Sequence, residues 1–149
     1  MDPSWIAPDQ QFSDLTAAYA GRPVISAPPG FRKDERSLRA AYEARRINNL
    51  AGLRDDHVLE IGCGEGDLAF EIACNYNSVV VGIDVRRFAG WDLLNCPRLT
   101  LAQCDVAATE SLWPPNTFSR IVSRAAWEHI RHPYSALKNC RDLLKPGGR

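Results

Sequence analysis

The sequence predicts an α/β domain built on a Rossmann-like parallel sheet with flanking helices. From residue 57 onward, short apolar segments alternate with stretches of helical periodicity. Three glycines occupy alternate positions, Gly62, Gly64 and Gly66, between the first apolar segment and the helical stretch after it. Acidic residues, Asp84 and Asp105, close the next two apolar segments. Together these observations indicate parallel strands whose carboxyl ends meet at one edge of the sheet.

The chain before the sheet divides into two parts. Residues 1–33 are predicted to be an N-terminal arm or linker, because prolines and glycines crowd positions 21–30, although Phe12 to Ala20 has the period of a short helix. Residues 34–52 are predicted to form a helix capped by Asp34. Its expected apolar side consists of Leu38, Ala41, Tyr42 and Leu50.

Residues 53–149 are predicted to form the Rossmann-like domain. The expected strands are His57 to Ile61, Val79 to Asp84, Leu99 to Gln103 and Arg120 to Ser123. The expected helices are Asp67 to about Tyr76 and Ser135 to Leu144, with a short helix or turn over 86–95. The last helix is expected to bury Ala136, Leu137, Cys140, Leu143 and Leu144. Val79 to Asp84 is the clearest strand, since it is apolar on both faces, as in a covered parallel sheet.

The amino-acid composition disfavours several classes of protein. The 149 residues are 45% hydrophobic and 24% charged, which is typical of a globular domain rather than a disordered chain. Eighteen basic residues balance eighteen acidic residues, so binding of nucleic acid through bulk charge is disfavoured. The first twenty residues do not resemble a signal peptide, and no apolar run approaches the roughly 20 residues of a membrane span.

The cysteines indicate a reducing, cytoplasm-like compartment. Five cysteines are scattered, without a C-x-x-C pair and without histidines at ligand spacing. They are Cys63, Cys74, Cys96, Cys104 and Cys140. Small buried thiols explain this set better than a zinc site, so no metal is predicted.

The glycine loop indicates a cofactor that lies against the backbone. A dinucleotide fingerprint would require a third glycine at position 67, where this chain has Asp67. Glu65 and Asp67 would satisfy the positive end of the helix and repel a pyrophosphate. S-adenosylmethionine has no phosphate and carries a positive sulfonium and amino group, so it suits this acidic loop better.

The stretch E-x-G-x-G-x-G, formed by Glu60, Gly62, Gly64 and Gly66, resembles motif I of the class I S-adenosylmethionine-dependent methyltransferases. The resemblance covers roughly residues 45–149. Two further stretches resemble the small-molecule branch of that family, which includes quinone-biosynthesis enzymes. They are Ser123 to Ile130, similar to an L-E-H-[VI] segment, and Leu143 to Gly148, similar to an L-K-P-G-G turn.

The acidic strand ends gain roles from this resemblance. Asp84, 22 residues after Gly62, can accept hydrogen bonds from both ribose hydroxyls, although the same spacing fits a nicotinamide cofactor. The resemblance implies that Asp105 accepts from the adenine amino group and that the Val106 amide meets the ring. It also implies that Glu60 orients the glycine loop and the methionine end of the cofactor. The candidate cofactor-binding residues are Glu60, Gly62, Cys63, Gly64, Gly66, Asp84, Val85, Asp105, Val106, Ser123 and Arg124.

The expected reaction is direct displacement at the sulfonium methyl by a small-molecule nucleophile. Alignment and desolvation suffice for such a step, so the sequence needs no nucleophile, triad or metal. His129 is the candidate general base, since imidazole titrates near neutrality, with a packing or capping role as its alternative. The resemblance also suggests that the helix over 34–52 forms part of a substrate lid.

Other interpretations stay open. The family's sheet has seven strands, whereas this chain stops after the fourth strand and its helix, so we expect a truncated domain. A non-catalytic interaction module, which the missing strands favour, is therefore one alternative. A nicotinamide-dependent oxidoreductase is another, because the spacing of Asp84 fits it, although Asp67 in place of the third glycine speaks against it. Trp113 to Asn116 does not match the Asn/Asp-Pro-Pro-aromatic motif of nucleic-acid methyltransferases, because its prolines come in the wrong order and before the strand. The sequence does not specify the acceptor or the oligomeric state.

Overall fold

A computed structural model describes residues 35–149 of the chain. The predicted arm, the helix expected over Phe12 to Ala20 and the Asp34 cap lie outside the described residues. The α-helices are α2 (Glu35–Ala51), α3 (Asp67–Asn75) and α4 (Pro133–Leu143). The strands are β1 (His57–Ile61), β2 (Val79–Asp84), β3 (Leu99–Gln103) and β4 (Arg120–Ser123). Short 3₁₀ helices are η1 (Ala89–Leu93), η2 (Val106–Ser111) and η3 (Trp127–His129).

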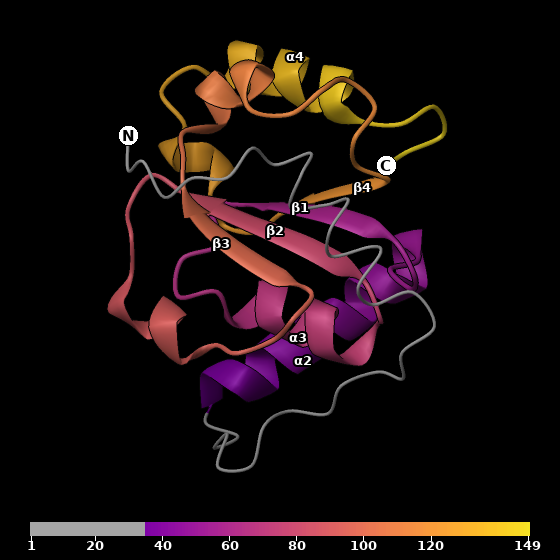
Figure 1. Ribbon diagram of the computed structural model, residues 1–149, viewed down its shortest axis with the longest axis vertical. Coiled ribbons are helices and arrows are strands. Elements are labelled where there is room, and N and C mark those ends of the chain that lie inside the picture. The colour runs from indigo at the N-terminus through magenta and orange to yellow at the C-terminus, as the bar shows by residue number, and fades with distance from the viewer. Residues whose placement is uncertain (1–34) are drawn as a thin grey trace.

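The four strands form one parallel sheet in the order β3-β2-β1-β4. Helices α2 and α3 cover one face and α4 covers the other, which confirms the predicted Rossmann-like architecture (Figure 1). Strand β4 is at one edge of this sheet. There the Arg149 N–H donates to the Ser119 carbonyl (3.1 Å) and the Ile121 N–H donates to the Arg149 carbonyl (2.8 Å). Arg149 therefore lies alongside the outer edge of β4.

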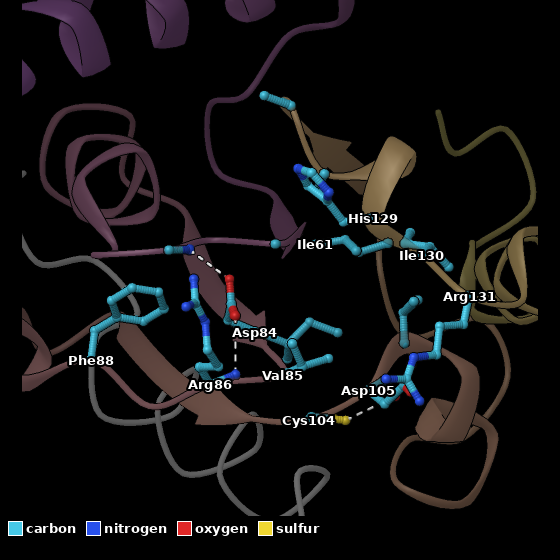
Figure 2. Close-up of a pocket in the computed structure, with 16 residues that line it drawn as sticks. Ile61, Asp84, Val85, Arg86, Phe88, Cys104, Asp105, His129, Ile130 and Arg131 are labelled. Carbon is cyan, nitrogen blue, oxygen red and sulfur yellow. Dashed lines mark hydrogen bonds between the residues drawn. The ribbon is translucent and has the colours of Figure 1, made fainter.

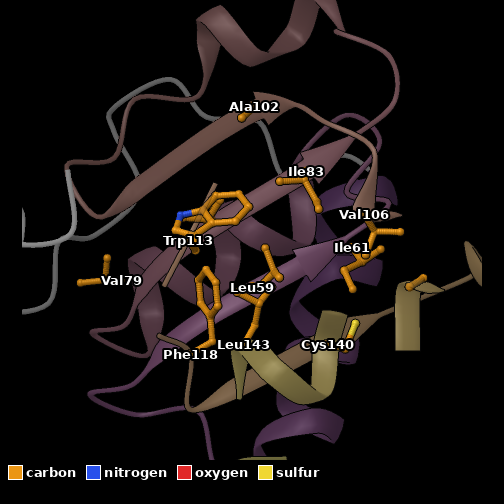
Figure 3. Packing of buried hydrophobic residues seen from close by; sticks show 12 residues of the cluster. Leu59, Ile61, Val79, Ile83, Ala102, Val106, Trp113, Phe118, Cys140 and Leu143 are labelled. Atoms are coloured by element: carbon orange, nitrogen blue, oxygen red, sulfur yellow. The ribbon is translucent and has the colours of Figure 1, made fainter. Parts of the chain in front are cut away.

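Side chains of β1 alternate between two apolar cores. Leu59 and Ile61 face α4, whereas Val58 packs with α2 and α3 on the opposite face. On the α4 side, the Trp113 and Phe118 rings meet edge to face with 5.6 Å between centroids (Figure 3). Glu60 shares the parity of Val58, so its carboxyl is directed to the α3 side, where apolar packing otherwise dominates.

The four predicted strands agree with the structure at both ends. The helices differ slightly: α4 begins at Pro133 rather than Ser135, because proline is favoured in the first helical turn, and it ends one residue earlier, at Leu143. Helix α3 ends at Asn75, with Tyr76 as its C-cap. The sequence analysis did not predict η2 and η3.

The predicted apolar side of α2 was wrong. Leu38, Tyr42 and Leu50 are 57%, 62% and 75% exposed, and the helix instead buries the small residues Ala40 and Ala44 against α3. Small side chains let two helices approach closely, so the longer apolar side chains are turned outward. On α4, Leu137 was also expected to be buried but is exposed, and the polar residue Asn139 is buried instead.

The cysteines are free thiols, and four of the five are buried, as predicted; Cys104 is partly exposed. Over residues 35–149, no group of three or more potential ligands is placed to hold a metal ion. Within the same range, every helix is too short or too polar to cross a membrane.

Candidate functional site

A cavity of about 740 Å³ lies at the carboxyl edge of the sheet (Figure 2). Its lining comes from the loops after β1, β2 and β3 and from the segment between β4 and α4. The lining residues are Ile61, Gly62, Gly64, Ile83, Asp84, Val85, Arg86, Phe88, Cys104, Asp105, Val106, Ala125, Ala126, His129, Ile130 and Arg131. This edge is where parallel α/β sheets bind their ligands.

Two glycines of the loop serve different purposes. At Gly62 (φ +71°), a Cβ atom would lie 2.3 Å from the Ala126 Cβ, so glycine is required for the β4–α4 segment to approach the loop. At Gly64 (φ +53°), a Cβ atom would meet nothing within 4 Å. Because Gly64 lines the cavity, its bare backbone leaves room for a ligand to contact the main chain.

The glycine loop is held from two directions. One oxygen of the Asp84 carboxylate accepts from the Gly64 N–H and the other accepts from the Arg86 N–H, both at 3.0 Å. From the other side, the indole of buried Trp91 donates to the Gly64 carbonyl at 2.7 Å. Asp84 therefore fixes the loop while its carboxylate, with further lone pairs, lies at the cavity wall.

Asp105 and Val106 lie where β3 gives way to η2. One Asp105 carboxylate oxygen accepts from the Ala107 N–H at 2.9 Å and so caps the 3₁₀ helix. Val106 is the first residue of η2, so its N–H has no acceptor within that helix. Beside them, burial and the Asp105 charge raise the pKa of the Cys104 thiol to about 12, which keeps it neutral in the cavity wall.

Glu60 lies beneath the loop and does not line the cavity. Its side chain is 3% exposed, and its carboxyl accepts from the Ala69 N–H in the first turn of α3. Burial raises the pKa of Glu60 to about 8, against the opposing effects of the Ala69 bond and the Arg124 charge. Oε2 of Glu60 has no hydrogen-bond partner among the described residues.

The segment between β4 and α4 forms the opposite wall of the cavity (Figure 2). Ala125 has φ +51°, an unfavourable backbone conformation for a residue with a Cβ, and such strain is common at ligand sites. His129 and Arg131 are exposed side chains on this wall, and Ile130 adds an apolar surface between them. The wall therefore offers an imidazole and a guanidinium beside apolar carbon.

The structure gathers most of the predicted site around this cavity. The predicted residues that line it are Gly62, Gly64, Asp84, Val85, Asp105, Val106 and His129. The others do not line it: Glu60 is buried below the loop, the Cys63 side chain is buried within it, and Gly66 is the N-cap of α3. Ser123 donates through Oγ to the Ile61 carbonyl at 3.0 Å, and Arg124 is exposed.

Several lining residues were missed in the sequence. Arg86 and Phe88 lie in the helix or turn predicted over 86–95, and Arg131 follows the stretch from Ser123 to Ile130, but no motif distinguished them from surface residues. Arg86 lies over the Phe88 ring, 5.2 Å from its centroid, a pairing that an i,i+2 spacing in a loop does not reveal. Trp91 had no sequence signal either, since its role depends on the Gly64 carbonyl 27 positions away. None of the cavity's lining residues belongs to α2, so a lid function of this helix stays a prediction.

Known proteins resemble this chain both in sequence and in fold. A ubiquinone biosynthesis O-methyltransferase from Colwellia psychrerythraea is 29% identical over 146 residues, which cover 93% of this chain and 56% of that protein. The chain thus spans about half the length of the curated relatives it matches.

Two solved structures share the fold. The 1,6-didemethyltoxoflavin-N1-methyltransferase of Burkholderia thailandensis, solved with its substrate and S-adenosylhomocysteine, has a TM-score of 0.57 and 18% identity. That alignment covers 99% of this chain and 64% of the other. The [4+2]-cyclase SpnF has a TM-score of 0.66 and 21% identity, covering 93% of this chain and 56% of its own. At such identities these likenesses establish the fold, and the cyclase shows that the fold alone does not fix a reaction.

A family description, "Methyltransferase domain", matches residues 59–149, which is more than half of the sequence and includes the glycine loop, both acidic strand ends and the β4–α4 segment. The resemblance drawn from the motif after β1 is confirmed: the chain belongs to the methyltransferase-domain family.

Proposed function

We propose that the chain is the cofactor-binding part of an S-adenosylmethionine-dependent methyltransferase that acts on a small molecule. The observation that carries this proposal is the placement of two carboxylates, Asp84 and Asp105, at adjacent strand ends around the open backbone of Gly64. A ribose diol and an adenine amino group are donors that suit these acceptors.

The N-terminus of α3 favours a ligand without phosphates. Helix N-termini attract anions, but here the Ala69 N–H already bonds the Glu60 carboxyl, and Asp67 occupies the first turn. A pyrophosphate would be repelled by Asp67 and would find the Ala69 N–H already bonded, whereas a cationic ligand would be attracted to Asp67. This is the physical reason for preferring S-adenosylmethionine to a dinucleotide.

Each part of the cavity has its own role in this proposal. Asp84 would bind the ribose, Asp105 and Val106 the adenine edge, and the glycine loop would support the rest of the cofactor, which supplies an activated methyl group. The β4–α4 wall would receive the acceptor, with Ile130 excluding water. His129 would take a proton from an acceptor hydroxyl in this scheme.

The acceptor is proposed from the relatives. The curated relatives are named as O-methyltransferases of ubiquinone biosynthesis, which suggests an oxygen nucleophile on a small organic molecule. This chain spans 56% of one such relative, so we propose only the part of the acceptor site that the β4–α4 wall forms. We also propose a cytoplasmic location, on the basis of five cysteines, four of them buried, none paired in a disulfide.

Titration calorimetry with S-adenosylhomocysteine tests the proposal. The wild-type chain should bind, and Asp84→Asn should weaken binding at least about tenfold, because hydrogen bonds to a charged acceptor are worth about 1.5–3 kcal/mol. Asp92→Asn is the matched control, since Asp92 is exposed, pairs with Arg87 and lies outside the cavity. Folded wild-type protein that binds no S-adenosylhomocysteine would refute the proposal and leave a non-catalytic module as the better interpretation.

A further inference from the structure

One buried polar side chain links α4 to the cavity without lining it. Asn139 is 3% exposed and lies on the inner face of α4, among the apolar residues Ala136, Cys140 and Leu143. Its Nδ2 donates to the Val106 carbonyl at 3.1 Å and to the Ala107 carbonyl at 3.0 Å. Both acceptors belong to η2, directly after Asp105 in the cavity wall.

The hydrogen bonds of Asn139 connect residues far apart in the sequence, whereas the other side-chain hydrogen bonds of this turn connect near neighbours. Asp105 caps the Ala107 N–H, and the hydroxyl of buried Thr109 donates to the Val106 carbonyl at 2.8 Å. Those contacts are local, and they shape the turn without fixing its place in the fold. The Asn139 amide spans 33 positions of sequence and ties the turn to a helix that packs on the sheet.

An amide at this position is costly unless it has a specific use. Burying an amide without partners is unfavourable by about 1–3 kcal/mol, and an apolar side chain would continue the packing of α4 without that risk. Because one amide nitrogen donates to two successive carbonyls, it fixes both the distance between the turn and α4 and the orientation of the turn. The atoms so restrained are the backbone that carries the Asp105 carboxylate and the Val106 N–H.

We propose that Asn139 is a positioning residue that sets how selectively the cavity recognises the 6-amino edge of adenine. This inference rests on the proposed function, in which Asp105 accepts from that amino group and the Val106 N–H donates to the neighbouring ring nitrogen. If the turn shifts, both contacts lengthen together. Selectivity for the base should then fall more than general affinity for a nucleoside.

The test compares two ligands, S-adenosylhomocysteine and its inosine analogue, in which a carbonyl oxygen replaces the 6-amino group. The analogue would set an oxygen against the Asp105 carboxylate and a ring N–H against the Val106 N–H, so wild type should prefer the adenine compound at least about tenfold. Asn139→Leu should reduce the ratio of the two dissociation constants at least about fivefold, bringing it near one.

Variants of α4 separate positioning from stability. Cys140→Ala removes a buried group from the same helix but no bond to η2, so it should lower the melting temperature and keep the wild-type ratio. Asn139→Ser is smaller and keeps a donor, and it should give an intermediate ratio. If Asn139→Leu does not fold, Asn139→Ser decides alone: a ratio clearly below wild type supports the inference, and a wild-type ratio overturns it.

The outcomes distinguish this inference from the proposed function. If wild type binds neither ligand, the proposed function fails, and the inference fails with it. If wild type prefers the adenine compound and the Asn139 variants keep that preference, the inference alone is overturned. Absence of any preference in wild type also overturns it, while leaving S-adenosylmethionine binding intact.

Discussion

At the scale of single residues, the Glu60 carboxyl should make stability depend on pH. Burial raises its pKa from 4.5 to about 8, so the folded chain keeps a proton that the unfolded chain has lost between these values. The folded state therefore binds more protons, and the free energy of unfolding should fall as pH rises from about 4.5 to about 8. At about 1.4 kcal/mol per pKa unit, the loss is on the order of a few kcal/mol.

Urea unfolding of wild type and Glu60→Gln at several pH values measures this effect. The amide cannot ionise, so the variant should lose most of the decline and be more stable than wild type near pH 8. Glu128→Gln is the control, since Glu128 is exposed outside the core and its removal should leave the decline in place. Parallel stability curves for wild type and Glu60→Gln would contradict the prediction.

Substitution by alanine should destabilise the fold to different extents at Gly62 and Gly64. Gly62→Ala should destabilise the fold by roughly 2–5 kcal/mol, because its Cβ would lie 2.3 Å from that of Ala126 at φ +71°. Gly64→Ala should cost only about 1–2 kcal/mol, since it adds backbone strain without a clash.

Ligand binding should also respond to the substitution at Gly64, where the fold tolerates the new methyl group. Gly64→Ala places a methyl group in open space beside the cavity, so it should weaken S-adenosylhomocysteine binding although the protein stays folded. Thermal unfolding and calorimetry on both variants provide the comparison. A Gly64→Ala protein with wild-type affinity would show that no ligand approaches this backbone.

At the scale of elements, Arg120 joins the end of α2 to β4. Its Nε donates to the Ala51 carbonyl at 2.8 Å and the Gly52 carbonyl at 2.9 Å, and its Nη2 pairs with Asp56 at 3.4 Å. A guanidinium can bond both helix-end carbonyls and the carboxylate at once. Arg120→Met, which keeps the apolar stem, should therefore lower the free energy of unfolding by about 1–3 kcal/mol.

Chemical denaturation measures this loss. Arg141→Met serves as a control, because exposed Arg141 bonds only its neighbour Asp142 in the described structure. Since Arg120 lies at the amino end of β4, away from the cavity, affinity for S-adenosylhomocysteine should not change. A wild-type midpoint for Arg120→Met would mean that water replaces the guanidinium at the end of α2.

At the scale of the whole molecule, the cavity should distinguish between cofactor classes. A ligand that binds only the folded state at 100 times its dissociation constant stabilises that state by about 2.7 kcal/mol. S-adenosylhomocysteine should therefore raise the melting temperature, whereas NAD should not, because Asp67 occupies the first turn of α3 and the Ala69 N–H is already bonded to Glu60. A thermal-shift comparison is the measurement, and preferential stabilisation by NAD would favour the oxidoreductase alternative.

Particular residues show how much of the fold and of the site could be predicted from the sequence. Local signals were enough for the strands and for Asp84 and Asp105, because β-branched runs and strand-end carboxylates lie within a few positions of each other. The outward turn of Leu38 and Tyr42 could not be foreseen, since the choice between large and small residues on α2 depends on how closely α3 approaches. For the same reason the roles of Trp91 and Asn139 had no sequence signal, as their partners are far along the chain.

The sequence by itself determined the parallel α/β architecture, the glycine loop and the acidic strand ends, because each follows from a short pattern of residue types. Only the tertiary structure decided which of these residues share a cavity, that Glu60 lies beneath it, and that Ala126 and Asn139 shape its walls. The physical reason is distance along the chain. Backbone preferences act between neighbours, whereas burial, hydrogen bonding and close approach in the site join residues that are brought together only when the helices pack on the sheet.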